Sequence, residues 1–183
     1  EVAEIDGSVE AQEAGHFRAM EVCLGAVDHA FARLRAALTA GERITEYAVQ
    51  QEVLEFMQRG GLHTFAPPIA GVDAHAADPH YEPGPEGSSE IRSDQVFLLD
   101  LWGKETAPGS VYADITWCAW TGAKVPDEQR NVWEAVTGAR DAGIAKALEV
   151  AKRPVFGWEV DRATRAVIEK AGHGEHFIHR TGH

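Results

Sequence analysis

Two apolar segments near the middle of the chain constrain the fold most. Residues 96–103 read VFLLDLWG, and residues 111–120 read VYADITWCAW. Both segments are rich in β-branched and aromatic side chains, which favour strands. The turn-rich link KETAPGS separates them, so the two strands can adjoin as a hairpin.

Helical patterns flank these two strands on both sides. Residues 12–40 carry one apolar stripe with steps of three and four, and Gly41 ends it. The stripe consists of Phe17, Met20, Leu24, Val27, Phe31, Leu34 and Leu38. A second helix is expected over residues 45–59, with Thr45 as its N-cap and Gly60-Gly61 as its stop.

The remaining elements complete an α+β pattern. Residues 62–72 are short and β-like, and helices are expected over residues 126–151, with Pro126 at the first position, and over residues 158–171. The tail EHFIHRTGH predicts the start of a further strand. This order favours one α+β domain in which helices cover one face of an antiparallel sheet.

The segment from Gly71 to Gln95 is rich in Pro, Gly, His and Ser. A loop of this length inside a compact domain is usually either functional or disordered. Because strands resume directly after it, its composition does not indicate a linker between domains.

Charge and composition exclude several classes of partner. The chain has 183 residues and a net charge of −12, which argues against binding to nucleic acid or to an anionic membrane surface. No apolar run approaches the roughly 18 residues of a membrane span. The acidic start EVAEIDGSVE does not have the layout of a signal peptide. Two cysteines, read as free thiols, favour a cytoplasmic location.

Two aspartates are the main candidates for chemistry. Asp100 is placed at the end of the first strand and Asp114 inside the second. A carboxylate is costly to bury unless it is paired, hydrogen-bonded or bound to a metal. The two side chains could therefore share a divalent cation across the hairpin. The alternative is that Asp100 caps a turn and Asp114 faces solvent.

Histidines and one cysteine add further candidates. His75, His80, His176, His179 and His183 lie in loop-like or terminal segments, where an imidazole can bind a metal or move protons near neutral pH. The alternative for each histidine is an ordinary surface or core residue. Cys118 is either a ligand, a nucleophile or a small buried apolar residue. Phosphate-loop, dinucleotide-binding, CxxC and GxSxG motifs are absent from the sequence.

Several segments together resemble one known family. The strings FLLDLWG and VYADITWCAWTG, then VPDEQRNVWEAVTGARDAGIAKAL, and then WEVDRATRAVIEKAGHGEHFIHRTGH resemble the pita-bread metallopeptidases. This family includes methionine aminopeptidase, proline aminopeptidase, prolidase and the non-peptidase creatinase. The upstream IAGVDAHAADPHYEP resembles the family's substrate-side histidine segment. The HRTGH ending places the chain nearer the Xaa-Pro peptidases.

The resemblance implies a role for five residues. Asp100 matches the first metal-binding aspartate, Asp114 the aspartate that bridges two metals, and His183 the histidine ligand. His80 matches the histidine that contacts substrate, and His179 a second substrate-side histidine near the scissile bond. The implied cofactors are two divalent ions, which could be manganese, cobalt, zinc or iron. The implied reaction is exopeptidase cleavage of a peptide or dipeptide at Xaa-Pro bonds by a metal-bridging water.

The sequence departs from the family pattern at three places. Trp117 stands where the family usually has an arginine, and the link between the two aspartates is a few residues longer than usual. The family's two glutamate ligands lie downstream of the histidine, so we expect a domain over residues 1–183 that is truncated before its C-terminal strands. We also expect residues 1–183 to lack the N-terminal accessory domain that the proline-specific members carry.

These departures leave two alternatives to the metallopeptidase reading. One is a catalytically inactive binding module with the pita-bread fold, and the other is a creatinase-like hydrolase that uses the fold without metals. We expect the chain alone to be inactive. Sheet edges that the missing strands would pair with favour a homodimer.

Overall fold

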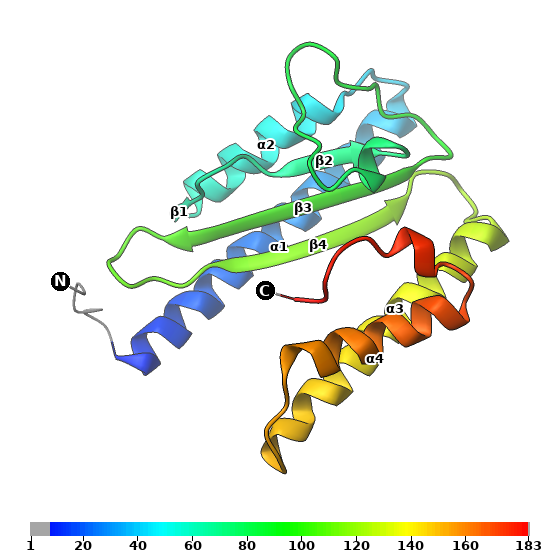
Figure 1. Ribbon diagram of the computed structural model, residues 1–183. Coiled ribbons are helices and arrows are strands. Elements are labelled where there is room, and N and C mark those ends of the chain that lie inside the picture. Colours follow the sequence, from blue (N-terminus) through cyan, green and yellow to red (C-terminus); the bar gives the residue numbers. More distant parts are fainter. Residues whose placement is uncertain (1–7, 183) are drawn as a thin grey trace. The chain divides into compact units, whose positions relative to one another are not determined.

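The computed structural model describes residues 8–182, and it divides into two compact units at Ala123 and Lys124 (Figure 1). The N-terminal unit contains α1 (Val9–Ala40), α2 (Glu46–Arg59), β1 (Leu62–His63), β2 (Ile69–Val72), the 3₁₀ turn η1 (His75–Ala77), β3 (Val96–Glu105) and β4 (Ala113–Trp120). The C-terminal unit contains α3 (Asp127–Leu148), η2 (Glu149–Ala151), α4 (Gly157–Lys170) and η3 (Gly174–His176). The expected mixture of helices with an antiparallel sheet is therefore confirmed in the described residues.

β3 organises the sheet because it pairs antiparallel with each of the other three strands. β2 lies beside its first half, with Ile69 opposite Asp100. β1 pairs with its end, and β4 runs along nearly its whole length. The predicted hairpin is confirmed, since the register of β3 and β4 is continuous from the Val96–Trp120 pair to the Gly103–Ala113 pair.

α1 confirms the predicted helix, but its fully buried face includes only Val27 and Leu34 of the predicted stripe. Its buried residues are mostly small: Gly15, Ala19, Cys23, Ala26, Val27, Ala30, Leu34 and Ala37. Phe17 and Leu24, both predicted in the stripe, are 58% and 40% exposed. Small side chains allow the helix to approach its neighbours closely, so the larger residues are displaced to the rim of the interface. Gly41 ends the helix in the left-handed conformation, at φ +67°.

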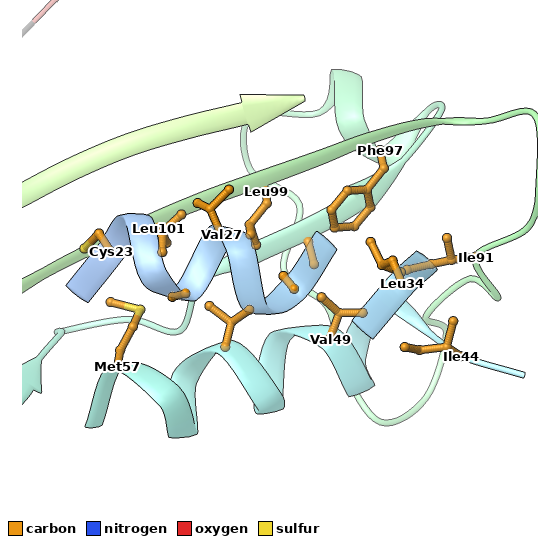
Figure 2. Close-up of a cluster of buried hydrophobic side chains, with 14 of the residues drawn as sticks. Cys23, Val27, Leu34, Ile44, Val49, Met57, Ile91, Phe97, Leu99 and Leu101 are labelled. Atoms are coloured by element: carbon orange, nitrogen blue, oxygen red, sulfur yellow. The ribbon is translucent and has the colours of Figure 1, made fainter. Parts of the chain in front are cut away.

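The core of the N-terminal unit lies between the two helices and the sheet, as Figure 2 shows. α2 begins as predicted, because the Thr45 hydroxyl accepts a hydrogen bond from the backbone N–H of Ala48. Val49, Val53 and Met57 of α2 are buried. They pack in one cluster with alternate residues of β3, namely Phe97, Leu99 and Leu101. Since strand side chains alternate, the even-numbered residues of β3 lie on the opposite face of the sheet.

The C-terminal unit is a pair of helices that pack closely at one point. A Cβ atom added to Gly143 of α3 would lie 2.6 Å from the hydroxyl oxygen of Thr164 on α4. Glycine at this position therefore allows the two helices to approach. Arg153, in the connection between them, forms ion pairs with Glu149 and Glu159.

The predicted strand in the tail is wrong over its described part. After η3, residues 177–182 contain no strand and only two bends, at His179 and Thr181. Their backbone groups bind side chains of α4: Arg165 donates to the carbonyl oxygens of Phe177 and His179 at 2.7 and 2.9 Å. Asp161 accepts from the N–H of Thr181 at 2.8 Å. The tail makes these contacts because the C-terminal unit offers its described residues no neighbouring strand for pairing. No helix among residues 8–182 is long and apolar enough to cross a membrane.

Candidate metal centre

The two candidate aspartates lie on the same face of the sheet. Asp100 and Trp102 alternate along β3, away from the buried Leu99 and Leu101. In the register of the hairpin, Trp102 is opposite Asp114 and Thr116 is opposite Asp100. The two carboxylates are therefore diagonal neighbours on adjacent strands, a separation that side chains commonly bridge.

The position of Asp100 differs from the prediction in one respect. It lies in the middle of β3 and does not end the strand, which continues to Glu105. The strand is longer because its last residues pair with β1. This rules out the turn-capping alternative for Asp100, while Asp114 is indeed exposed.

Thr116 orients the first carboxylate. Its hydroxyl donates a hydrogen bond of 2.5 Å to Oδ1 of Asp100. A bond of this kind limits the rotation of the carboxylate. Sequence analysis did not single out Thr116, although its position two residues after Asp114 on the same strand is a signal that could have found it.

The two cysteines are poor candidates for a nucleophile. Burial raises the pKa of the Cys118 thiol, and the negative charge of Asp100 raises that pKa further. Burial, helped by Asp114, raises the pKa of Cys23 to about 11. Because the thiolate is the reactive form, neither side chain has the low pKa of a catalytic cysteine. The reading of Cys118 as a small, largely apolar residue fits these surroundings best.

The loop after β2 carries His80 on its surface. The backbone N–H of His80 donates to Oδ1 of Asp78 at 2.9 Å, which forms a tight local turn. The loop is ordered by one buried carboxylate, that of Glu46 at the start of α2, which is fully buried. Glu46 accepts hydrogen bonds from four groups: the N–H of Val72, Nδ1 of His75, the Tyr81 hydroxyl and the N–H of Ser89.

The sequence did not identify Glu46 as a candidate, because the residues around it are ordinary for the start of a helix. An acidic residue in the first turn of a helix is common, since the helix dipole favours it there. Nothing in the neighbouring sequence shows that the side chain turns inward. The loop's four donors lie 26 to 43 residues further along the chain.

The two remaining predicted residues belong to the C-terminal end of the chain. His179 is exposed in the tail of the C-terminal unit, where its carbonyl oxygen accepts from Arg165. His183 lies outside the described residues. The structure therefore brings together Asp100 and Asp114, with the His80 loop in the same unit.

The donor set of this face suits a divalent cation. Two carboxylates supply the charged oxygen ligands that hard and borderline divalent ions accept. Groups of three or more His, Cys, Asp or Glu side chains that could hold a metal are not found among residues 8–182. Within the part of the chain that the structure describes, the aspartate pair stands without a third such side chain close enough to complete a group of this kind.

Comparisons with known proteins identify the family of this chain. The sequence profile of metallopeptidase family M24 matches residues 16–183. The Xaa-Pro dipeptidase of Lactobacillus helveticus is 31% identical over 127 residues, which are 69% of this chain and 32% of that protein. The chain spans about a third of the length of the curated relatives it matches.

Solved structures show the same fold. Prolidase from Pyrococcus furiosus superposes with a TM-score of 0.69 at 22% identity, over 96% of this chain and 47% of that one. X-prolyl aminopeptidase from Caenorhabditis elegans is described as a cytosolic enzyme with a di-nuclear active site. It gives a TM-score of 0.68 at 24% identity, over 90% of this chain and 26% of that one. These likenesses confirm the pita-bread fold that the sequence predicts.

An antiparallel sheet with helices on one face and an aspartate pair on the other thus defines a pita-bread domain of the metallopeptidase type. The chain belongs to metallopeptidase family M24.

Proposed function

We propose that this chain carries part of the active site of a metal-dependent exopeptidase that cleaves Xaa-Pro bonds. The observation that supports the proposal is the diagonal placement of Asp100 and Asp114 on one sheet face in a chain of this family. The similarity to an Xaa-Pro dipeptidase supports the substrate class.

In this proposal each residue has a defined task. Asp100, oriented by Thr116, and Asp114, in the shared-ligand role that the family resemblance implies, would hold two divalent ions, and His183 would add an imidazole ligand. Divalent ions bound there would supply Lewis-acid chemistry, which lowers the pKa of a water and polarises a carbonyl group. His80 and His179 take the substrate-side roles that the family resemblance implies, in which an imidazole can donate a hydrogen bond to the developing oxyanion or pass a proton.

The test is to measure hydrolysis by the complete protein. The substrates are an Xaa-Pro dipeptide and a tripeptide that begins with Xaa-Pro, since dipeptidase activity requires the first and aminopeptidase activity the second. Metal content is measured in the same samples by mass spectrometry. We expect hydrolysis that EDTA abolishes and that manganese, cobalt, zinc or iron restores.

The decisive variant is Asp114→Ala. We expect it to lower metal-dependent turnover by more than roughly 10²-fold and to reduce the metal content, since even second-shell changes cost 10- to 100-fold. The matched control is Glu105→Ala, which removes a carboxylate from the same sheet. Glu105 pairs with Arg18 of α1 on the other face, so its loss should leave turnover within about twofold. Full turnover in Asp114→Ala would overturn the role of this aspartate.

A further inference from the structure

We infer that Glu46 is a positioning residue, whose buried carboxylate holds the loop that presents His80 to the substrate. The inference rests on the proposed function, because it assigns a purpose to the order of the His80 loop. Glu46 itself is fully buried and cannot contact a substrate.

The first step of the argument is the number of donors that meet this carboxylate. The N–H groups of Val72 and Ser89 donate to it at 2.8 and 2.7 Å, and the Tyr81 hydroxyl donates at 2.5 Å. Nδ1 of His75 lies 2.9 and 3.0 Å from its two oxygens. An ionised carboxylate only accepts hydrogen bonds and has about four lone-pair sites, so this one is fully satisfied. It also follows that Nδ1 of His75 is the protonated nitrogen in this pair.

The second step is where these donors lie along the chain. They stand at the start, in the middle and at the end of the segment from Val72 to Ser89. One side chain thus closes a loop rich in Pro, Gly and Ala, which contains no strand or α-helix from Asp73 to Ser89. The N–H of Glu46 also donates to the carbonyl of Ser89 at 3.1 Å, which fixes the end of the loop to the start of α2.

The third step connects the group of hydrogen bonds around the Glu46 carboxylate, here called the clamp, to His80. Tyr81 follows His80 directly, and its ring stacks on His75 with the ring centres 4.0 Å apart. The Tyr81 hydroxyl is therefore fixed by Glu46, and the Tyr81 ring is fixed by His75. The backbone just before it is fixed by the turn at Asp78. His80 is held between two anchored residues while its own side chain remains exposed.

The fourth step connects the loop to the aspartates. Val72 is the last residue of β2, which pairs with β3 opposite Phe97, and Ile69 of the same strand pairs with Asp100. Oδ1 and Oδ2 of Asp73 accept from the N–H of Val96 and the side chain of Gln95. The clamp and the metal-binding face therefore share one sheet, so a shift of the loop changes the distance from His80 to the aspartates.

The experiment compares Glu46→Gln and Tyr81→Phe in the complete protein. A glutamine offers one acceptor oxygen in place of two. Its NH₂ group is a donor and would face the N–H and O–H donors that now bind the second carboxylate oxygen. Tyr81→Phe keeps the ring on His75 and removes only the O–H, so it tests the clamp even if Glu46→Gln fails to fold. The control is Glu52→Gln, which removes a charge from the same helix at a partly exposed ion pair with Arg33.

The first measurement is hydrogen exchange of the amides in residues 73–88. We expect both variants to increase exchange there by about tenfold or more, with no change in α1 or in the Glu52→Gln control. The second is turnover, where misplacement of a catalytic group by about 1 Å can cost roughly 10²-fold. We expect kcat to fall with metal content unchanged.

A double-variant cycle separates positioning from general damage. If Glu46 acts through His80, then Glu46→Gln should lower kcat less than twofold when His80→Ala is already present. The inference would be overturned if Glu46→Gln lowered kcat equally with and without His80→Ala. It would also be overturned if hydrogen exchange were unchanged in both Glu46→Gln and Tyr81→Phe. A wild-type protein that hydrolyses no Xaa-Pro substrate overturns the proposed function instead, whereas the exchange measurement tests the clamp without any activity.

Discussion

At the scale of single residues, Tyr81 is the group whose surroundings alter its chemistry most clearly. Burial, together with the hydrogen bond to Glu46, raises the pKa of Tyr81 to about 12. The folded state therefore holds the phenol proton more tightly than the unfolded chain does. The resulting contribution to stability is fully present below the ordinary tyrosine pKa of about 10 and is lost as the pH rises from there towards 12.

This shift predicts an alkaline transition that depends on one hydroxyl. In Tyr81→Phe, we expect the free energy of unfolding to fall less steeply between pH 10 and 12 than in the wild-type protein. Urea denaturation at a series of pH values measures this slope. Identical slopes in the two proteins would show that folding does not raise the pKa of Tyr81.

Individual residues of the site could be predicted only where the chain places them close together. Asp100 and Asp114 belong to consecutive strands, so their pairing follows from a hairpin that composition alone indicates. Glu46 and its four donors are brought together by the tertiary fold, and the local sequence around each one is ordinary. The same holds for Thr116, whose function depends on the register that sets it opposite Asp100.

At the scale of elements, the close approach of α1 to the core predicts an asymmetry between large and small residues. Ala26 is fully buried on the helix, whereas Leu24 is 40% exposed. We expect Ala26→Leu to destabilise the protein by about 1–3 kcal/mol through overpacking. Leu24→Ala should cost less than about 1 kcal/mol because the side chain is largely at the surface.

Urea denaturation of both variants tests this order. If Leu24→Ala proved the more damaging of the two, the predicted stripe of large residues would describe the buried face better than the structure does. The stripe itself shows why the sequence pattern was only partly correct. Periodicity predicts that a helix forms and where Gly41 ends it, but alanines on a neighbouring face also suit a helix that packs closely. The surface against which α1 packs decides which of those faces is buried.

At the scale of the whole molecule, the two units differ greatly in what they bury. The connected apolar core, which includes Cys23, Val53, Phe97 and Leu101, belongs to the N-terminal unit. In the described helices of the C-terminal unit, the buried residues are Ala139, Gly143, Thr164 and Ile168. Burial of apolar surface is the main source of stability, so the N-terminal unit should fold with little help.

This contrast predicts different behaviour for the isolated units. Residues 8–123 expressed alone should unfold cooperatively in urea, with fixed near-UV circular dichroism. Residues 124–183 expressed alone should show at most a helical far-UV circular dichroism signal. They should show no cooperative unfolding transition in urea. A cooperative transition for the second fragment would mean that its small core suffices. The expectation of a single domain over residues 1–183 stays a prediction that this experiment also addresses.

The connection from β3 to β4 has a consequence for how this protein can vary. Residues 106–112 lie outside both strands, and the register on either side is set by alternation between the core and the opposite face. Extra residues inserted at the tip, near Gly109, therefore lengthen the turn without sliding one aspartate past the other. The unusually long link noted in the sequence is thus a place where evolution can add or remove residues freely. A single deletion within β4, by contrast, would shift the alternation and turn Asp114 away from the sheet face that it shares with Asp100.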